Sequence, residues 1–162
     1  MADKTKVAFM IATWFGAGNA PKAPGTCGSL AALPFAFVIS AIFGSSVLFL
    51  AAVAAYVAGV WSSDIVMKEL GEHDPGRIVI DEVAGQWLTL IVAPLNVRAY
   101  LIGFVLFRLF DIFKPAPIRQ IDAEMRNATG VMLDDIMAGF YAMLCLYVIT
   151  GFLLPHTFVG LF

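Results

Sequence analysis

Five carboxylates in three short motifs are the side chains of this sequence best suited to hold a metal ion. They are Asp81 and Glu82 in IVIDEVAG, Asp111 in FRLFDIFKP, and Asp134 and Asp135 in VMLDDIMAG. Carboxylate oxygens suit hard divalent cations such as magnesium, calcium or manganese. The sequence has no cluster of His and Cys that would suit zinc. We therefore expect these acids to form a metal-dependent catalytic site.

The two acid pairs also have a plainer explanation. Asp and Glu are favoured at helix N-termini, where they cap free N–H groups and complement the helix dipole. Asp81–Glu82 and Asp134–Asp135 each precede an apolar helical pattern. Asp111 does not fit this explanation, because it lies near the end of a predicted helix, where an anion is disfavoured. Capping therefore stays open for the pairs but not for Asp111.

Two cations flank Asp111 and could bind a phosphate. On a helix, Arg108 lies one turn before Asp111 on the same face, and Pro115 helps to end the helix after Lys114. An intrahelical salt bridge is one interpretation of this motif. Beside a metal ion, Arg108 and Lys114 would instead hold the oxygens of a phosphate.

A glycine-rich segment, PGTCGS at residues 24–29, is a second candidate for phosphate binding. Glycines that lead into a helix N-terminus leave N–H groups free for an anion, and here two hydroxyl groups accompany them. The candidate residues are Gly25, Thr26, Gly28 and Ser29. The alternative is an ordinary helix start in which Thr26 or Ser29 is the cap.

The composition indicates that a membrane protein, or an unusually apolar helical bundle, carries these residues. Of the 162 residues, 60% are hydrophobic and 14% are charged, whereas soluble domains typically carry about 25% charged residues. The net charge of -2 offers no basic surface for nucleic acid. We expect helices at about 28–43, 46–69, 82–93, 97–112 and 135–154, preceded by a short interfacial helix at about 5–16.

This pattern predicts an all-α fold, a membrane-embedded bundle of about five helices plus a short N-terminal interfacial helix, in one domain over residues 1–162. Threading the helices alternately across a bilayer brings every acidic residue, and nine of the ten Lys and Arg, to one side. An excess of Lys and Arg marks the cytoplasmic side. The helix at 82–93 would be about 18 Å long, too short for a hydrocarbon core of about 30 Å. It could form a re-entrant hairpin with 97–112, and a soluble bundle also stays open.

A weak internal repeat links two of the acidic motifs. Residues 76–85 (GRIVIDEVAG) align without gaps on residues 130–139 (GVMLDDIMAG), so that Asp81 matches Asp135 and Gly85 matches Gly139. Small residues let membrane helices approach closely. We therefore expect the two segments to pack together and to bring Asp81 near Asp135.

Four motifs in the same order resemble the phosphatidylglycerophosphatase A family: PGTCGS (24–29), GEHDPGRIVIDE (71–82), FRLFDIFKPAPI (107–118) and GVMLDDIMAG (130–139). The resemblance implies a bacterial, all-helical, Mg²⁺-dependent enzyme of phospholipid biosynthesis, which removes the terminal phosphate of phosphatidylglycerophosphate to give phosphatidylglycerol. It implies a multi-pass protein of the inner membrane, with a lipid substrate and an active site that faces the cytoplasm. The five acids would be catalytic and would hold Mg²⁺, while Arg108, Lys114 and the 25–29 segment would bind phosphate. The oligomeric state is not predicted.

Two other functions compete with this interpretation. A CDP-alcohol phosphotransferase is also a metal-dependent membrane enzyme of phospholipid synthesis, but the run of Asp, Gly, Ala and Arg that it needs is not found. A membrane ion carrier would use the acids as its binding site, although it needs carboxylates at the bilayer midplane rather than at helix ends. Within the phosphatase interpretation, both direct attack by water and an aspartyl-phosphate intermediate stay open.

Overall fold

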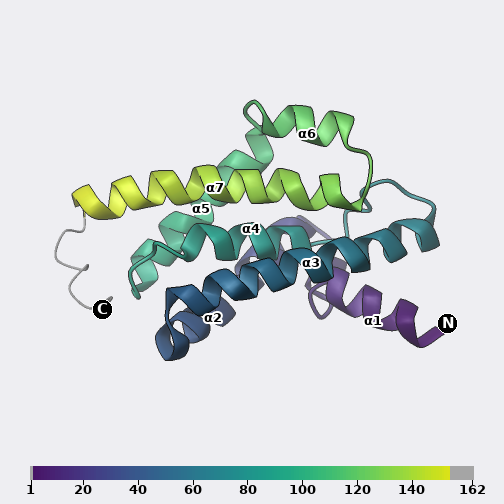
Figure 1. The fold of residues 1–162 in the computed structure, drawn as a ribbon, viewed down its shortest axis with the longest axis horizontal. Helices are drawn as coiled ribbons and strands as arrows, with labels where there is room; N and C mark the ends of the chain where they lie inside the picture. The colour runs from purple at the N-terminus through teal and green to yellow at the C-terminus, as the bar shows by residue number, and fades with distance from the viewer. Residues whose placement is uncertain (1, 154–162) are drawn as a thin grey trace.

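The computed structural model describes residues 2–153, and this part of the chain is helical, with no strand (Figure 1). The predicted all-α fold is confirmed. The helices are α1 (Ala2–Ala12), α2 (Pro24–Phe43), α3 (Ser45–Leu70), α4 (Ile80–Leu90), α5 (Val97–Phe113), α6 (Ile118–Glu124) and α7 (Ala128–Leu153), with a short 3-10 helix η1 (Ala17–Asn19) between α1 and α2.

Three of these helices, α2, α3 and α7, are long and apolar enough to cross a membrane. Their outer faces carry large apolar side chains that no other part of the described chain covers: Ile42 on α2 is 65% exposed, Val57 on α3 is 62% exposed, and Val148 on α7 is 54% exposed. A soluble monomer rarely exposes contiguous apolar surface on this scale, whereas lipid covers it without cost. The chain is therefore a membrane protein.

The short helix α4 is the centre of the bundle. It lies between α3 and α7 (Figure 1) and also packs against α2 and α5. Nine of its eleven residues are buried, so neither face is left for lipid. Trp87 fixes it to α2 by donating a hydrogen bond from Nε1 to the carbonyl oxygen of Ala32, at 3.0 Å. At about 1.5 Å per residue, α4 is too short to span a bilayer, as its predicted length indicated.

Helix α5 returns antiparallel to α4. Gly103, in the middle of α5, lies against Leu90 at the end of α4, whereas Phe107, one turn later, lies against Gly85 in the middle of α4. The turn between the two helices ends at Asn96, whose side chain accepts a hydrogen bond from the Ala99 N–H and so caps α5. The two helices therefore form an antiparallel hairpin, and its re-entrant placement in a membrane stays a prediction.

Two helices begin at least four residues earlier than predicted. Helix α2 starts at Pro24 rather than at residue 28, because a proline at the first helical position has a backbone angle already suited to a helix. Helix α7 starts at Ala128 rather than at residue 135, where the Asn127 side chain accepts a hydrogen bond from the Gly130 N–H at 2.9 Å. Its predicted last residue, 154, lies outside the described residues.

Two further differences concern the end of α1 and the segment between α5 and α7. Helix α1 stops at Ala12 rather than at residue 16, because the backbone turns through left-handed conformations at Trp14, Phe15 and Gly16. Helix α6 was not predicted, since the segment 113–134 was expected to be a loop. With seven residues, α6 is too short to show a clear apolar periodicity in the sequence.

Candidate active site

The candidate site is built on direct backbone contact between α4 and α7. A Cβ atom added to Gly85 would lie 2.5 Å from the carbonyl oxygen of Asp135, and one added to Gly139 would overlap the backbone of Gly85. The Thr89 hydroxyl lies at the same crossing and has the carbonyl oxygens of Gly85 and Gly139 within 2.9 and 3.2 Å. Because both positions are glycine, the helices come close enough to join the acids that they carry.

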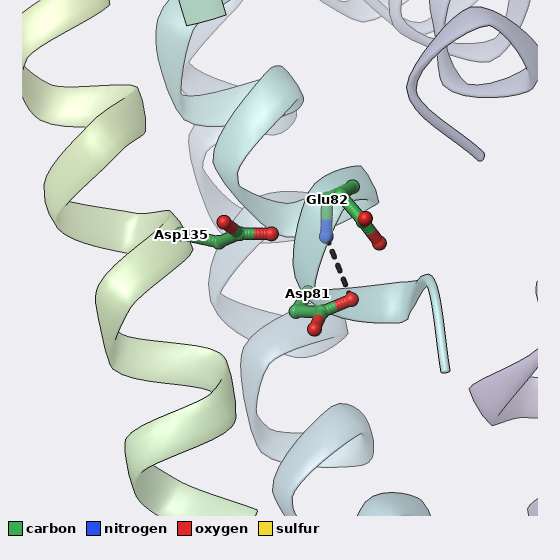
Figure 2. A group of neighbouring side chains, drawn as sticks. All are labelled: Asp81, Glu82 and Asp135. Carbon is green, nitrogen blue, oxygen red and sulfur yellow. Dashed lines mark hydrogen bonds between the residues drawn. The ribbon is translucent and has the colours of Figure 1, made fainter. Parts of the chain in front are cut away.

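Three carboxylates meet at this crossing. Asp81 and Glu82 lie in the first turn of α4, and Asp135 reaches toward them from α7 (Figure 2). Each offers an oxygen, and these oxygens all lie within 4.8 Å of one another. The internal repeat correctly predicted that Asp81 and Asp135 are neighbours. Asp135 lies in the second turn of α7, so capping does not explain it.

The cluster is buried, and its three carboxylates outnumber the cations in contact with them. Asp81 is 7% exposed and Asp135 is 4% exposed. Asp81 Oδ1 accepts a hydrogen bond from the Glu82 N–H at 3.0 Å, but Glu82 Oε2 is buried without a partner in the described residues. Burial raises the pKa of Glu82 to about 7. Burial and the charge of Glu82 raise the pKa of Asp81 well above its usual value.

Arg108 borders the cluster from α5. Its Nη1 atom lies 2.6 Å from Asp111 Oδ2 and 3.5 Å from Glu82 Oε1, and Ser29 Oγ is 3.4 Å away. Its Nε atom is buried without a partner in the described part of the chain. Asp111 thus forms the intrahelical pair with Arg108 that the sequence left open, and it is not one of the three clustered carboxylates.

The PGTCGS segment forms the first turns of α2 rather than a loop before it. A Cβ atom on Gly25 would overlap the Glu82 carboxylate, and one on Gly28 would lie 2.7 Å from the Cβ of Val79. Both glycines therefore allow α2 to approach α4. Ser29 is fully buried and donates a hydrogen bond to the Gly25 carbonyl oxygen, while Thr26 is half-buried.

Lys114 stands at the end of α5 and joins two further acids. Its Nζ atom lies 2.7 Å from Asp134 Oδ2 on α7 and 2.9 Å from Asp122 Oδ1 on α6. Burial alone would lower the pKa of Lys114, but the hydrogen bonds to the two carboxylates outweigh burial and raise it. The sequence did not single out Asp122, since a lone acid in a predicted loop gives no signal.

The site therefore has two parts, and in both of them carboxylates outnumber cations. One part is the carboxylate cluster with Arg108 beside it, and the other is Lys114 with its two acids. Together six carboxylates face two cations: Asp81, Glu82, Asp111, Asp122, Asp134 and Asp135 against Arg108 and Lys114. An excess of buried negative charge is costly unless cations balance it.

The similarity to known proteins covers most of the chain. The profile of the phosphatidylglycerophosphatase A family matches residues 10–150. Phosphatidylglycerophosphatase A of Escherichia coli (strain K12) is 39% identical over 141 residues, which cover 86% of this chain and 81% of the relative. Phosphatidylglycerophosphatase A of Haemophilus influenzae is 34% identical over 146 residues, which cover 90% of each chain.

A Bacteroides thetaiotaomicron protein provisionally named as a phosphatidylinositol-3-phosphatase is 37% identical over 152 residues, which cover 86% of this chain and 91% of the relative. No solved structure matches significantly. Since the profile extends over the segments that carry all the acids of the site, and both phosphatidylglycerophosphatase A relatives are at least 34% identical over most of the chain, the chain belongs to the phosphatidylglycerophosphatase A family.

Proposed function

We propose that this protein hydrolyses the terminal phosphate ester of phosphatidylglycerophosphate, a step that yields phosphatidylglycerol. The observation that carries the proposal is the buried cluster of Asp81, Glu82 and Asp135 beside Arg108, in a chain of this family. The protein would act in the bacterial inner membrane, with α2, α3 and α7 crossing the bilayer. The ends of α3 and α7 nearest the acids would then face the cytoplasm, where Lys and Arg concentrate.

The donor set of the cluster fits a hard divalent cation, and we propose Mg²⁺. Three carboxylate oxygens within 4.8 Å of one another resemble the oxygen-only ligand sets that Mg²⁺ takes. The buried Glu82 Oε2 without a partner supports this fit, because such an atom is costly unless something binds it. Asp81, Glu82 and Asp135 would hold the cation, which supplies charge neutralisation for the phosphoryl group and acidifies water.

The two cations of the site would bind the phosphate itself. Arg108 offers a planar fork of N–H donors that matches phosphate oxygens, and its Nε has no partner in the described residues. Ser29 and Asp111 both contact the Nη1 atom of the guanidinium, so this end of the fork is held before substrate arrives. Lys114 would bind a second oxygen as a point charge. This arrangement stabilises the charge that spreads over the phosphoryl oxygens in the transition state.

Hydrolysis needs a nucleophile in line with the bond that breaks. In the direct mechanism that we favour, a water oxygen bonds to phosphorus while the bond from phosphorus to the glycerol oxygen breaks, and that oxygen takes up a proton. Asp111 or Asp134, the acids outside the three-carboxylate cluster, would orient the water. Rapid acid quench during turnover tests this choice, because recovery of a phosphorylated aspartate would establish the covalent alternative.

Phosphate release by the purified protein in phospholipid vesicles tests the proposed function. We expect release from phosphatidylglycerophosphate with Mg²⁺, less release from phosphatidylinositol 3-phosphate, and none with EDTA. Asp81→Asn should abolish release, whereas the matched control Asp64→Asn should not, because Asp64 is half exposed and pairs with Lys68 outside the cluster.

Three results would contradict the proposal. Full activity of Asp81→Asn would refute the assigned site. Faster release from phosphatidylinositol 3-phosphate than from phosphatidylglycerophosphate would indicate the substrate that the name of the Bacteroides relative gives. Ion flux through phospholipid vesicles that contain no phosphatidylglycerophosphate, lost in Asp81→Asn, would support the carrier interpretation instead.

A further inference from the structure

The Lys114 ammonium is held by two carboxylates from two different helices. Asp134 on α7 lies 2.7 Å from Nζ, and Asp122 on α6 lies 2.9 Å from it. Asp134 is almost completely buried, with 8% of its side chain exposed, whereas 42% of the Asp122 side chain is exposed. One buried carboxylate is enough to balance the charge of Lys114. The second contact therefore needs another explanation.

The second carboxylate fixes a direction. An ammonium has three N–H donors in a tetrahedral arrangement, so two acceptors at fixed positions determine where the third N–H points. A lysine side chain has a flexible four-carbon stem, so holding its ammonium in one orientation costs conformational entropy. With Asp134 alone, the ammonium can rotate about its single contact.

The backbone at Lys114 turns the chain from α5 toward α6. Lys114 caps α5 in a left-handed conformation with a φ of 42°, which is uncommon for a residue other than glycine and persists where surrounding contacts impose it. This cap turns the chain out of α5, and α6 follows four residues later. Helix α6 packs against α7, so that Asp122 and Asp134 face the same ammonium from neighbouring helices.

We propose that Asp122 is a positioning residue, which holds the Lys114 ammonium so that its third N–H points at an oxygen of the phosphate ester. This inference rests on the proposed function, in which Lys114 binds phosphate. Asp122 itself does not touch the substrate. Helix α6 would thus serve to carry one carboxylate to the rim of the site.

The first test needs no enzymatic activity. In the protein reconstituted in lipid, the rate of acetylation of Lys114 by acetic anhydride is measured by mass spectrometry, with Lys68 as the internal reference. We expect Asp122→Asn to raise the rate at Lys114 severalfold and Asp122→Glu to raise it less. The control Glu124→Gln changes an exposed carboxylate on the same helix and should leave the rate unchanged. An unchanged rate in Asp122→Asn would overturn the proposal.

The second test is kinetic and uses phosphatidylglycerophosphate with Mg²⁺. Asp122→Asn should lower kcat/KM about tenfold, the loss expected for one charge-assisted hydrogen bond, and Asp122→Glu should recover part of it. In a Lys114→Met background, Asp122→Asn should have no further effect, because the two residues act as one unit. An equal loss in both backgrounds would overturn the proposal. If wild-type protein released no phosphate from any lipid, the proposed function would fail, and the acetylation rates would still decide whether Asp122 holds Lys114.

Discussion

Adding one methyl group at the α4–α7 crossing should disable the candidate metal site while leaving most of the fold intact. In Gly85→Ala the new Cβ would start 2.5 Å from the Asp135 carbonyl oxygen and 2.6 Å from a ring carbon of Phe107. Ordinary contacts of a Cβ begin at 3.4 Å. The helices must therefore separate by about 1 Å, and Asp135 moves with its own backbone.

The cost of this change falls on metal binding more than on folding. Overpacking typically costs about 1–3 kcal/mol, and the better helix propensity of alanine returns up to about 1 kcal/mol. Mg²⁺ tolerates little error, since it requires oxygens at about 2.0–2.1 Å in near-octahedral geometry. We therefore expect Asp135 to stop acting as a ligand. A tenfold weaker affinity would remove about 1.4 kcal/mol of the stabilisation that saturating Mg²⁺ provides.

Thermal unfolding in detergent, followed by circular dichroism with and without Mg²⁺, measures both effects. Wild type should gain melting temperature with Mg²⁺, and Gly85→Ala should lose most of that gain together with phosphate release. Gly151→Ala is the matched control, because it also adds a methyl group to a helix but places it in open space. If Gly85→Ala required no more Mg²⁺ than wild type, close contact of the helices would not be what assembles the site.

Three further changes test other parts of the site. Gly25→Ala should push the Glu82 carboxylate aside and lower phosphate release at least about tenfold. The control Gly76→Ala, whose new methyl group meets nothing within 4 Å, should match wild type. Equal activities of the two variants would show that Gly25 is not needed to place Glu82. Arg108→Lys keeps the charge but loses the fork, so kcat in the phosphate assay should fall about tenfold or more, and an unchanged kcat would show that the charge suffices. In EDTA, burial raises the pKa of Glu82 from 4.5 to about 7, so the folded state should lose stability as the pH rises through this range, because the unfolded chain has already released a proton that folding must take up again. Melting temperatures at about pH 5 and about pH 8 should differ less in Glu82→Gln than in wild type, and an equal difference would contradict the assigned pKa.

The fold class could be predicted from the sequence because it depends on hydrophobicity averaged over long segments. Charge-free stretches long enough to cross a bilayer are visible without any structure, and α2, α3 and α7 lie where those stretches are. The sequence also predicted that Asp81 and Asp135 are neighbours, since small residues in both copies of the weak repeat allow two helices to pack closely. Both predictions depend on features that several residues share.

Details that depend on one contact were not predictable in this way. Gly25 and Gly28 resemble loop glycines in the sequence, but they serve close packing inside the first turns of α2. Asp134 is indistinguishable by type from the clustered acids, and tertiary packing pairs it with Lys114 instead. Asp111 pairs with Arg108 one turn away on α5, an interpretation that the sequence left open but could not choose.

Binding of Mn²⁺, followed by electron paramagnetic resonance as a stand-in for Mg²⁺, tests most directly whether the buried carboxylates hold a divalent cation. Wild-type protein in detergent should bind Mn²⁺ tightly and release it when Mg²⁺ is added in excess. Asp135→Asn should bind at least about tenfold more weakly, while Asp64→Asn should bind as wild type does. Undiminished binding of Mn²⁺ in Asp135→Asn, or no tight binding in wild type, would contradict a metal site at Asp81, Glu82 and Asp135.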